Sequence, residues 1–512
     1  MPKELIAVLD FGSQYSHLIT RRIRECEVYS ELLPHTTKPQ ELVDMDARGV
    51  VLSGGPASVY DRDALKCDPG VFKMDIPVLG ICYGLQLMVQ TLGGSVKATN
   101  RREYGKTAVQ ITDNSDLFKG ISGNMVSWMS HGDYAETLPD GFEVIATSVN
   151  SQIAAIRNSS RRLYAVQFHP EVAHTENGLA IIRNFTTGIS HCSLNWNASS
   201  IIDTAINQIR SQVQSERVLT AVSGGVDSTT TAVLVKRAVG DRLTCVFVNH
   251  GFLRAGEEKT ILRLLGEELK LNLHYVDASA RFLDRLKGIV DPEEKRRIIG
   301  EEFIKVFDEE SRRLGPFKWL AQGTLYPDVI ESAGAGGPAS RIKTHHNVGG
   351  IPEWSKFQVI EPLRFLYKDE VRNIAKQLGI PGEIIQGHPF PGPGLAVRIM
   401  GEVTKEKLRI SREAGAIVED VLVKRGLHGT VWQAFAAVGD DLAVGVLGDQ
   451  RQLGRVVTIR IVKSLDGMTA DWARIPEEVL EEMSNRITGE VPGVSWVTYA
   501  ISSKPPATIE PC

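Results

Sequence analysis

The stretch "VLGICYGLQLM", residues 78–88, places Cys82 between two glycines at a change in the hydrophobic pattern. The apolar run at residues 76–81 is typical of a buried strand, and the apolar residues after Cys82 have the spacing of a helix. A sharp turn between a strand and a helix can lift a nucleophile above a sheet. Cys82 is therefore a candidate nucleophile, although a single free cysteine is more often a buried packing residue.

Strand and helix patterns alternate on both sides of this stretch, which indicates an α/β fold. The first series covers residues 5–195 and ends in the polar stretch 191–200, where we place a linker. A second series ends near "HPFPGPG", residues 388–394, whose prolines and glycines cannot continue a helix or a central strand. We predict two successive doubly wound α/β domains, 1–195 and 196–387, followed by a small α+β domain at 388–512.

Composition excludes several classes of protein. The chain has 58 Lys and Arg against 62 Asp and Glu, a formal net charge of −4, so no nucleic-acid partner is implied. No apolar run reaches about 18 residues and no signal-peptide pattern is present, so we expect a cytoplasmic protein without a membrane partner. The six cysteines form no C-x-x-C pair, which favours free thiols.

A second motif, "AVQFHPE", gives Cys82 a candidate base. His169 and Glu171 follow an apolar run and are two residues apart, so we expect them on the same side of a strand end. His169 can then carry protons and Glu171 can orient its imidazole, as in other nucleophile–base–acid triads. A helix N-terminus at Cys82 also favours the thiolate, because such sites lower a cysteine pKa from about 8.5 to roughly 3.5–7.5.

Acyl transfer also needs donors for the oxyanion. The backbone N–H of Tyr83 follows the nucleophile directly and is the first candidate. "LSGGPASVY", residues 52–60, follows another apolar run, and Gly54 or Gly55 there can supply a second backbone donor. We therefore expect these residues to line one site with Cys82.

The stretch "AVSGGVDSTTT", residues 221–231, predicts a phosphate site between a strand and a helix. Its candidate ligands are Ser223, Gly224, Gly225, Val226, Asp227, Ser228 and Thr229. Asp227 would repel phosphate unless it binds Mg²⁺ or caps the helix, and we expect both roles of it. The stretch "YGKT", residues 104–107, fails as a P-loop because Asn100 occupies the position of the first glycine, so the chain is not a P-loop ATPase.

"GICYGLQ", "LSGGP" and "QFHPE" together resemble the class I triad glutamine amidotransferases over the whole first domain. The resemblance implies that glutamine is hydrolysed through a glutamyl thioester, which releases ammonia. "MSHGD", residues 129–133, resembles the segment of that family near the glutamine site. His131 is thus either a substrate neighbour or a histidine whose ring is satisfied by the backbone.

"SGGVDS" resembles the signature of the ATP pyrophosphatases, which cleave ATP between the α and β phosphates. With "KRRIIG", "AQGTLYPDVIES", "IKTHHNVGG" and "KPPATIE", the whole chain resembles the glutamine-hydrolysing GMP synthetase family. The resemblance implies that ATP with Mg²⁺ adenylates the C2 oxygen of XMP and that ammonia displaces AMP to give GMP. It also implies a homodimer formed by the C-terminal domain, and no prosthetic group.

The same resemblance implies further site residues. Lys343 would belong to a mobile lid, and Arg296 and Lys504 would bind the XMP phosphate, with Thr508 and Glu510 contacting phosphate and purine. Without the resemblance, Arg296 would be a solvated helix residue and residues 504–512 a loose tail. The chain departs from the family at Asn249, where aspartate is usual, and at residues 511–512, which read Pro-Cys instead of Trp-Glu.

Two other functions stay open on the sequence. NAD synthesis uses the same adenylation chemistry, and a glutamine-sensing scaffold would bind glutamine without turning it over. The intact Cys82, His169 and Glu171 with the complete "SGGVDS" turn make the scaffold the weaker hypothesis.

Overall fold

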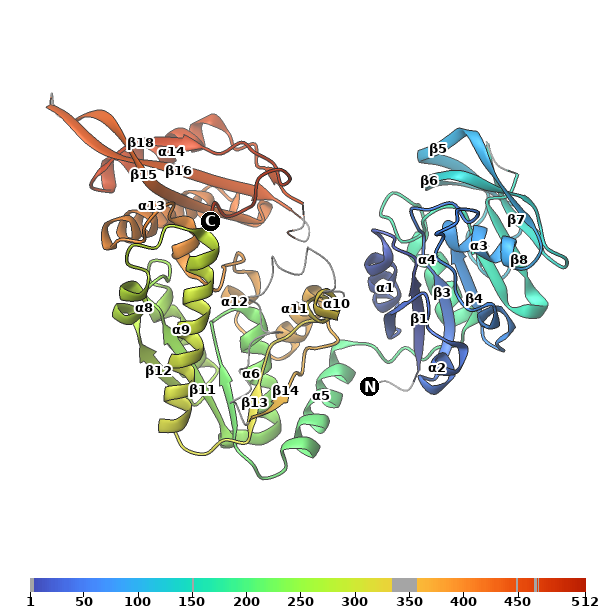
Figure 1. Cartoon of the computed structure of the whole chain (residues 1–512), viewed down its shortest axis with the longest axis horizontal. Helices are drawn as coiled ribbons and strands as arrows, with labels where there is room; N and C mark the ends of the chain where they lie inside the picture. Colours follow the sequence, from blue (N-terminus) through green and yellow to red (C-terminus); the bar gives the residue numbers. More distant parts are fainter. Residues whose placement is uncertain (1–3, 150–151, 334–356, 448–449, 465–466, 468) are drawn as a thin grey trace. The chain divides into compact units, whose positions relative to one another are not determined.

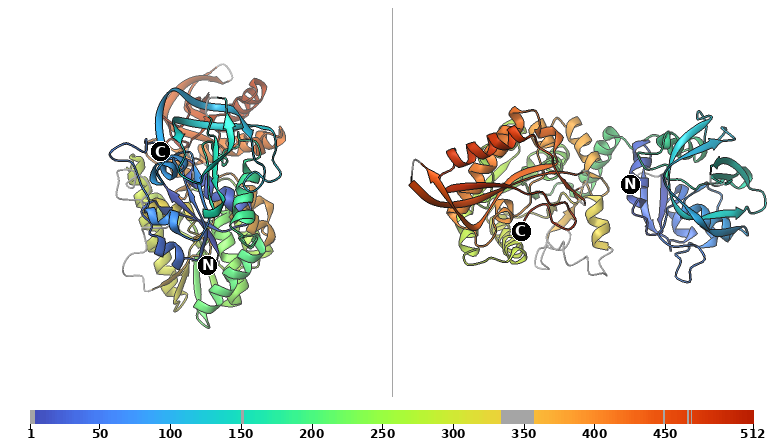
Figure 2. Two further views of the ribbon diagram at one scale, coloured as in Figure 1. Left: turned by 90° about the vertical axis from the view of Figure 1, so that its right-hand side faces the viewer. Right: turned by 90° about the horizontal axis from the view of Figure 1, so that it is seen from above.

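The computed structural model describes residues 4–149, 152–333, 357–447, 450–464, 467 and 469–512. The chain divides into two compact units, Met1–Ile201 and Ile202–Cys512 (Figure 1). Each unit has its own sheet structure, which two further views also show (Figure 2). The mixed α/β class predicted from the sequence is confirmed, whereas the two predicted boundaries between the three domains stay predictions.

Unit 1 contains one nine-stranded mixed sheet with the strand order β2-β1-β3-β4-β9-β8-β7-β5-β6. The first five strands in this order are parallel, and the other four pair in antiparallel fashion. The strand bounds are β1 Leu5–Asp10, β2 Ser30–Pro34, β3 Ala47–Leu52, β4 Val78–Ile81, β5 Ser95–Ile111, β6 Asn124–Thr137, β7 Glu143–Ser148, β8 Ala155–Asn158 and β9 Leu163–Val166.

The helices of unit 1 pack on this sheet through apolar faces. Ile19 and Ile23 of α1 share one buried core with Val8 of β1, Val51 of β3 and Leu79 of β4. The helix bounds are α1 Ser16–Glu25, α2 Pro39–Asp44, η1 Pro69–Lys73, α3 Tyr83–Thr91, η2 Ser159–Arg161, α4 Gly178–Arg183 and η3 Asn184–Ile189. Strand β4 and helix α3 are separated by Cys82 alone, as the sequence predicted.

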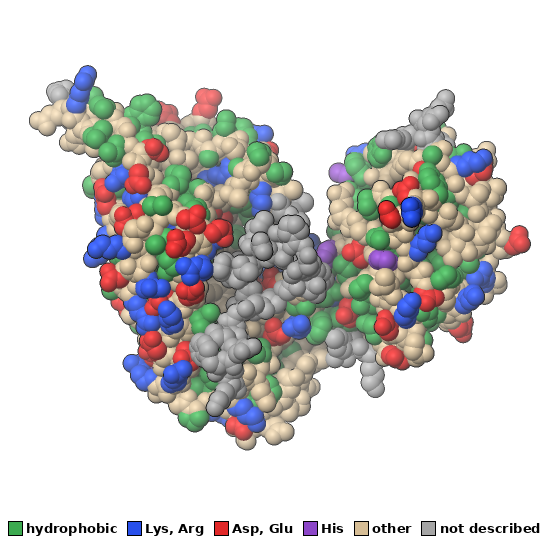
Figure 3. Space-filling view, in the orientation of Figure 1, with side chains coloured by type: hydrophobic (Ala, Val, Ile, Leu, Met, Phe, Trp, Pro, Cys, Tyr) green, Lys and Arg blue, Asp and Glu red, His purple; other side chains and the backbone are tan. Residues whose placement is uncertain are grey.

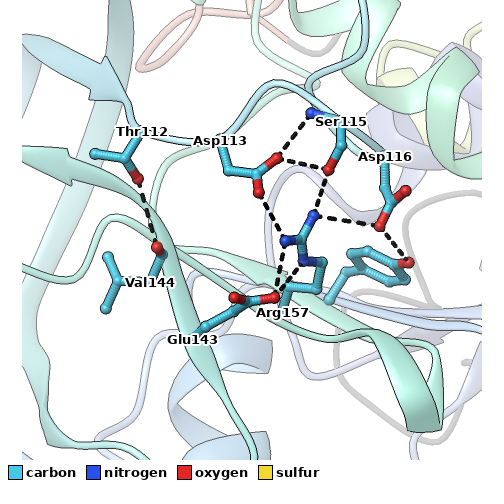
Figure 4. A network of polar contacts seen from close by, with 8 residues as sticks. Thr112, Asp113, Ser115, Asp116, Glu143, Val144 and Arg157 are labelled. Atoms are coloured by element: carbon cyan, nitrogen blue, oxygen red, sulfur yellow. Dashed lines mark hydrogen bonds and ion pairs between the residues drawn. The ribbon is translucent and has the colours of Figure 1, made fainter.

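A buried arginine forms several ion pairs at the antiparallel part of this sheet (Figure 4). Arg157 on β8 lies 2.8 Å from Glu143 on β7, 2.8 Å from Asp113 and 3.3 Å from Asp116. Its side chain is 9% exposed. Because one guanidinium carries several donors in a fixed plane, it joins the paired strands β7 and β8 to the loop after β5 that carries Asp113 and Asp116.

Unit 2 contains a five-stranded parallel sheet with the order β12-β11-β10-β13-β14. The strand bounds are β10 Val218–Ala221, β11 Leu243–Asn249, β12 Leu273–Asp277, β13 Trp319–Ala321 and β14 Gln358–Ile360. The strand order reverses beside β10, and open parallel sheets bind ligands outside the carboxyl ends of strands at such a point. The predicted phosphate turn follows β10 and therefore lies at this edge.

Helices connect the parallel strands and extend into the C-terminal part. The bounds are α5 Ala198–Val213, α6 Val226–Val239, η4 Gly240–Arg242, α7 Glu257–Ile261, η5 Leu262–Glu268, α8 Ser279–Arg285, α9 Pro292–Arg313, α10 Tyr326–Ala333, α11 Lys368–Gln377, α12 Gly382–Gln386, η7 Gly394–Arg398, α13 Lys405–Lys424, η8 His428–Thr430 and α14 Glu477–Glu490. No helix in the described part of the chain is both long and apolar enough to cross a membrane.

A third sheet contains β15 Gln433–Leu447, β16 Gln450–Lys463, β17 Asp471–Trp472 and β18 Val494–Tyr499. One hydrophobic core runs from Leu219 on β10 through Ile298 on α9 to Ile461 on β16. Residues 388–512 therefore share their core with the parallel sheet. All six cysteines are free, in agreement with the prediction.

Candidate functional site

Cys82 occupies the turn between β4 and α3 in a left-handed backbone conformation. Its φ is 52° and its ψ is −102°, values that non-glycine residues rarely adopt. Such strain persists only where the surrounding structure enforces it, and it is concentrated at functional sites. Cys82 is also the N-cap residue of α3, so its sulfur lies near the positive end of the helix dipole.

The two glycines around Cys82 are required by close packing. A Cβ on Gly80 would lie 2.6 Å from the carbonyl oxygen of Gly84, and a Cβ on Gly84 would lie 2.5 Å from that of Leu52. The positive φ belongs to Cys82 itself and not to either glycine. The glycines therefore let α3 approach the sheet closely, which forces the strained conformation onto Cys82.

His169 and Glu171 form a buried pair beside Cys82. Nδ1 of His169 lies 2.7 Å from Oε1 of Glu171, and the two side chains are 4% and 0% exposed. The expectation that both residues end a strand is wrong, because β9 ends at Val166 and both lie in the turn after it. The two side chains therefore meet because the chain turns between them, and not because alternate residues of a strand point to the same side.

The protonated form of His169 is stabilised by its neighbours. Burial lowers the pKa of His169, but the charge of Glu171 and hydrogen bonds with Cys82 and Glu171 raise it to about 11. The imidazole is therefore an imidazolium at neutral pH. An imidazolium beside a thiol favours the thiolate, which is the nucleophilic form of cysteine.

Two further groups contact the sulfur of Cys82, and neither was predicted from the sequence. The Cys82 thiol donates to the backbone oxygen of Ser130 over 3.7 Å, and Nε2 of Gln167 donates to the sulfur over 3.7 Å. Gln167 is fully buried. It lies two residues before His169 in the quoted motif, so the motif contained a signal for it.

The predicted oxyanion segment lies against the same site. A Cβ on Gly54 would lie 3.2 Å from Cε1 of His169, and one on Gly55 would lie 3.2 Å from the ring of Tyr83. Tyr83 is the first residue of α3, and the first N–H groups of a helix have no partner within the helix. Both predicted sources of backbone donors therefore adjoin the nucleophile.

His131 lies on β6 with both ring nitrogens engaged. Nδ1 lies 2.9 Å from the backbone oxygen of Asp133, and Nε2 lies 3.0 Å from Oε2 of Glu103. The side chains of His131 and Glu103 are each 3% exposed. In this structure the ring contacts protein groups, which agrees with the backbone-satisfied alternative and adds a carboxylate that the sequence did not suggest.

The predicted phosphate turn connects β10 to α6 and is open to solvent. Ser223 and Gly225 are exposed, and the hydroxyls of Ser223 and Ser228 lie 3.1 Å apart across the turn. Gly224 has a φ of +81°, and a Cβ there would lie 2.6 Å from the side chain of Ile261. The turn therefore presents backbone N–H groups and hydroxyls at the N-terminus of a helix, which is an anion site.

Asp227 lies in the first turn of α6 and is not its cap. The N-cap is Gly225 and no side chain caps the helix, so the predicted capping role is wrong. Oδ2 of Asp227 accepts a hydrogen bond from Lys368 on α11, whereas the buried Oδ1 has no partner among the described residues. One free carboxylate oxygen beside a phosphate site fits Mg²⁺, which is often held by one or two carboxylates and substrate phosphates.

Lys368 was not among the site residues predicted from the sequence. It brings a positive charge to the phosphate turn from 141 residues away along the chain. Its local pattern gave no signal for this role, because the contact with Asp227 depends on the packing of α11 beside α6.

The four predicted XMP residues all lie in unit 2. Arg296 on α9 donates to the backbone oxygen of Cys512 over 2.5 Å, and Lys504 donates to that of Gly467 over 2.8 Å. Thr508 donates to the backbone oxygen of Glu510, and the Glu510 carboxylate accepts from Gln433 over 2.6 Å. Residues 504–512 are thus held by side chains of α9 and β15. Lys343 lies outside the described residues.

Comparisons with known proteins cover both units. The family model "Glutamine amidotransferase class-I" matches residues 7–189, and "GMP synthase C terminal domain" matches residues 420–511. A GMP synthase (glutamine-hydrolyzing) of Synechocystis sp. is 53% identical over 99% of this chain and 95% of that protein. One of Thermosynechococcus vestitus is 53% identical over 100% of this chain and 97% of that protein.

A solved structure of a putative GMP synthase subunit from Thermoplasma acidophilum is similar to part of the chain. The match has 35% sequence identity and a TM-score of 0.35, and it covers 36% of this chain and 94% of that one.

Proposed function

The chain belongs to the family of glutamine-hydrolysing GMP synthases, and we propose that the residues described above carry out the reaction of that family here. The reaction consumes XMP, ATP and glutamine and yields GMP, AMP, pyrophosphate and glutamate. The comparisons favour neither NAD synthesis nor a glutamine-sensing scaffold. Full-length similarity carries this proposal, because it spans the cysteine site and the phosphate turn in one chain.

In the glutaminase half, the Cys82 thiolate attacks the side-chain carbonyl carbon of glutamine. The protonated His169 donates its proton to the departing nitrogen, so ammonia leaves and a glutamyl thioester remains. His169 then takes a proton from water, which cleaves the thioester and releases glutamate. Glu171 holds Nδ1 of the imidazole and stabilises its positive charge in both steps.

The negative oxygen formed in each step needs donors already in place. The backbone N–H of Tyr83 and one of Gly54 or Gly55 are proposed for this role, since both segments adjoin Cys82 and His169. His131 lies on the strand that brings the backbone oxygen of Ser130 to the sulfur. We propose that the contacts of His131 keep β6 in place beside the bound glutamine.

In the synthetase half, the phosphates of ATP bind the turn at residues 223–229. Ser223, Ser228 and Thr229 offer hydroxyls, and Gly224, Gly225 and Val226 offer backbone N–H groups. Asp227 would hold Mg²⁺ through its unpaired oxygen, and the ion would neutralise phosphate charge. Lys368 adds a second positive charge beside Asp227.

XMP would bind between α9 and the C-terminal residues. Arg296 and Lys504 are proposed for its phosphate, and Thr508 and Glu510 for its phosphate and purine. Their present contacts are mostly with backbone oxygens, which a phosphate can replace as hydrogen-bond acceptors. Lys343 is proposed as a lid residue on the resemblance alone.

We propose that the chain forms a homodimer through its C-terminal part, because this part exposes apolar side chains. The β15–β16 hairpin exposes large apolar side chains, and Leu453 lies directly opposite Val444 in its register. The exposed members are Leu442, Val444, Val446 and Leu453, which are 52%, 56%, 70% and 62% exposed. Apolar side chains gathered on one face of a hairpin favour association with a second copy.

We propose no nucleic-acid or membrane partner and a cytoplasmic location. The face of the molecule in Figure 3 carries acidic and basic side chains side by side. Many are paired, such as Arg281 with Glu309 and Arg297 with Glu301. A mixed surface of this kind gives no large single-sign field for a polyanion.

The experiment gives the purified protein ATP, Mg²⁺ and XMP, with either glutamine or ammonium as nitrogen source. GMP, AMP and pyrophosphate should form in equal amounts with both donors, with glutamate formed only from glutamine. A parallel assay replaces XMP by nicotinic acid adenine dinucleotide, which should not be amidated. Absence of GMP with both donors, or amidation of the dinucleotide instead, would refute the proposal.

A further inference from the structure

A single carboxylate is held rigidly where β11 ends. Tyr275 on β12 donates its hydroxyl to Oε1 of Glu258 over 2.6 Å, and the Asn249 amide donates to Oε2 over 3.0 Å. Oδ1 of Asn249 accepts the backbone N–H of Gly251 over 2.9 Å, which fixes the direction of the amide. Burial, and then the hydrogen bond to Glu258, raise the pKa of Tyr275 to about 12, so the hydroxyl stays a donor.

The helix that carries this carboxylate contacts the phosphate turn. Glu258 and Ile261 are three residues apart on α7, so they lie on the same face of the helix. The side chain of Ile261 packs against Gly224 in the turn. The helix that carries Glu258 therefore adjoins the backbone that would hold the ATP phosphates.

The order of the strands suggests what this carboxylate binds. In doubly wound sheets that bind nucleotides, phosphates lie on the turn after one strand, and an acidic residue about 20 residues further on binds the ribose hydroxyl. Here β10 precedes the phosphate turn, and β11 is its parallel neighbour. The residue at the end of β11 is Asn249, whose neutral amide cannot supply the charge itself but holds Glu258 in place.

We propose that Glu258 accepts hydrogen bonds from the 2′- and 3′-hydroxyls of the ATP ribose and so selects ribonucleotides over deoxyribonucleotides. Asn249 and Tyr275 are positioning residues for this carboxylate. The inference rests on the proposed binding of ATP at residues 223–229. It also gives a physical reason for an amide at position 249, because an aspartate there would face Glu258 with a like charge.

The donor and acceptor count agrees with this role. A carboxylate has about four acceptor sites, and two protein donors occupy two of them, which leaves acceptor capacity for two hydroxyls. Neighbouring carboxylates face cations instead: Glu257 pairs with Arg254, and Asp227 pairs with Lys368. Among the ion pairs of the described residues, none includes Glu258.

The experiment measures GMP formation with ammonium as nitrogen source and with ATP, 2′-deoxy-ATP or 3′-deoxy-ATP as the varied substrate. The wild type should show a KM for each deoxy analogue that is about tenfold higher than for ATP, the cost of one hydrogen bond to a charged acceptor. Glu258→Gln should raise the KM for ATP about 100-fold, because both hydrogen bonds are lost, and that for each deoxy analogue, which makes only one of them, about tenfold, so that the preference for ATP disappears. Tyr275→Phe should reduce the preference for ATP over the deoxy analogues, but by a smaller factor than Glu258→Gln.

The control is Glu267→Gln, which changes an exposed carboxylate on η5. This variant should prefer ATP over the deoxy analogues by the same factor as the wild type. A Glu258→Gln variant that raises the KM for ATP and deoxy-ATP by the same factor would show a structural role and overturn the inference. A wild type that does not discriminate between the nucleotides would overturn it without any variant. If the wild type makes no GMP, the proposed function fails, and direct titration of ATP against 2′-deoxy-ATP still decides the ribose contact.

Discussion

Nδ1 of His169 lies 2.7 Å from Oε1 of Glu171, and both side chains are buried in the turn after β9. Burial alone would lower the pKa of His169, whereas Glu171 and Cys82 raise it to about 11. The pair therefore sets both the charge of the imidazole and the direction of its free nitrogen.

Glu171→Gln should reduce glutamine-dependent synthesis by a factor of about 10²–10⁴, the range for a disturbed general base. It should also lower the pKa of His169, because the negative charge that opposes the effect of burial on this pKa is removed. As the pH is raised, kcat/KM for glutamine should therefore begin to fall at a lower pH in the variant than in the wild type. Ammonium-dependent synthesis is the internal control, and a change there of similar size would contradict the assignment.

The pair should also make stability depend on pH. The folded pKa of His169 is about 11, and a histidine in an unfolded chain has a pKa of about 6.5. The stabilisation is then fully present below pH about 6.5 and is lost as the pH rises through about 11. The difference in free energy of unfolding between wild type and Glu171→Gln should therefore shrink as the pH is raised from 7 to 10.

Arg157→Gln should lower the free energy of unfolding by about 1–3 kcal/mol, because its charged hydrogen bonds to Asp113 and Glu143 are lost (Figure 4). The Ser115 hydroxyl and backbone N–H, with Arg157, lower the pKa of Asp113 to about 2. An unfolded aspartate has a pKa of about 3.9, so the stabilisation by Asp113 is complete above that pH and lost as the pH falls through about 2.

Calorimetry of the full chain can measure both effects. The melting transition of Arg157→Gln should be shifted most near pH 7 and least near pH 2. The matched control is Arg62→Gln, an exposed arginine, which should melt like the wild type. An equal shift at both pH values would mean that Arg157 contributes by packing and not through its carboxylate partners.

Gly84→Ala should impair the glutaminase half selectively. The new Cβ would lie 2.5 Å from the backbone oxygen of Leu52, so α3 must move away from β3 and carry Cys82 with it. We expect a stability loss of about 1–3 kcal/mol and the loss of most glutamine-dependent synthesis. Gly188→Ala is the control, because a Cβ there meets nothing within 4 Å and the backbone φ is not positive. Normal glutamine use by Gly84→Ala would show that the strained turn is dispensable.

Asp227→Asn should abolish GMP synthesis from both glutamine and ammonium, because the phosphate turn loses its proposed magnesium ligand and Lys368 loses its partner. Pyrophosphate release from ATP measures the step directly. Asp241→Asn, at an exposed position after α6, is the control and should retain activity. Unchanged pyrophosphate release by Asp227→Asn would reject a role for this carboxylate in ATP chemistry.

Local patterns predicted the parts of the fold whose signal lies within a few residues. The strand at β4, the helix at α3 and the turn between them follow from apolar spacing and two glycines. The strands β10, β11, β12 and β13 of unit 2 likewise follow from alternating strand and helix patterns, whereas β14 was not predicted. The turn that carries His169 and Glu171 was mistaken for a strand end, because Pro170 suits an extended chain and a turn equally well.

Contacts between distant segments could not be predicted in this way. Lys368 meets Asp227 across 141 residues, and Glu103 meets His131 because β5 and β6 pair with an irregular register. Glu258 and Asn249 are near in sequence, but their contact depends on the return of the chain after β11. In each case the pairing is decided by tertiary packing, which one sequence does not display.

The most direct test of the account compares nitrogen donors in Cys82→Ala. Because the sulfur acts only on glutamine, the variant should form no GMP from glutamine, ATP and XMP, yet should match the wild type when ammonium replaces glutamine. Loss of both activities in a folded variant, or retention of glutamine use, would contradict the assignment of two separate sites in one chain.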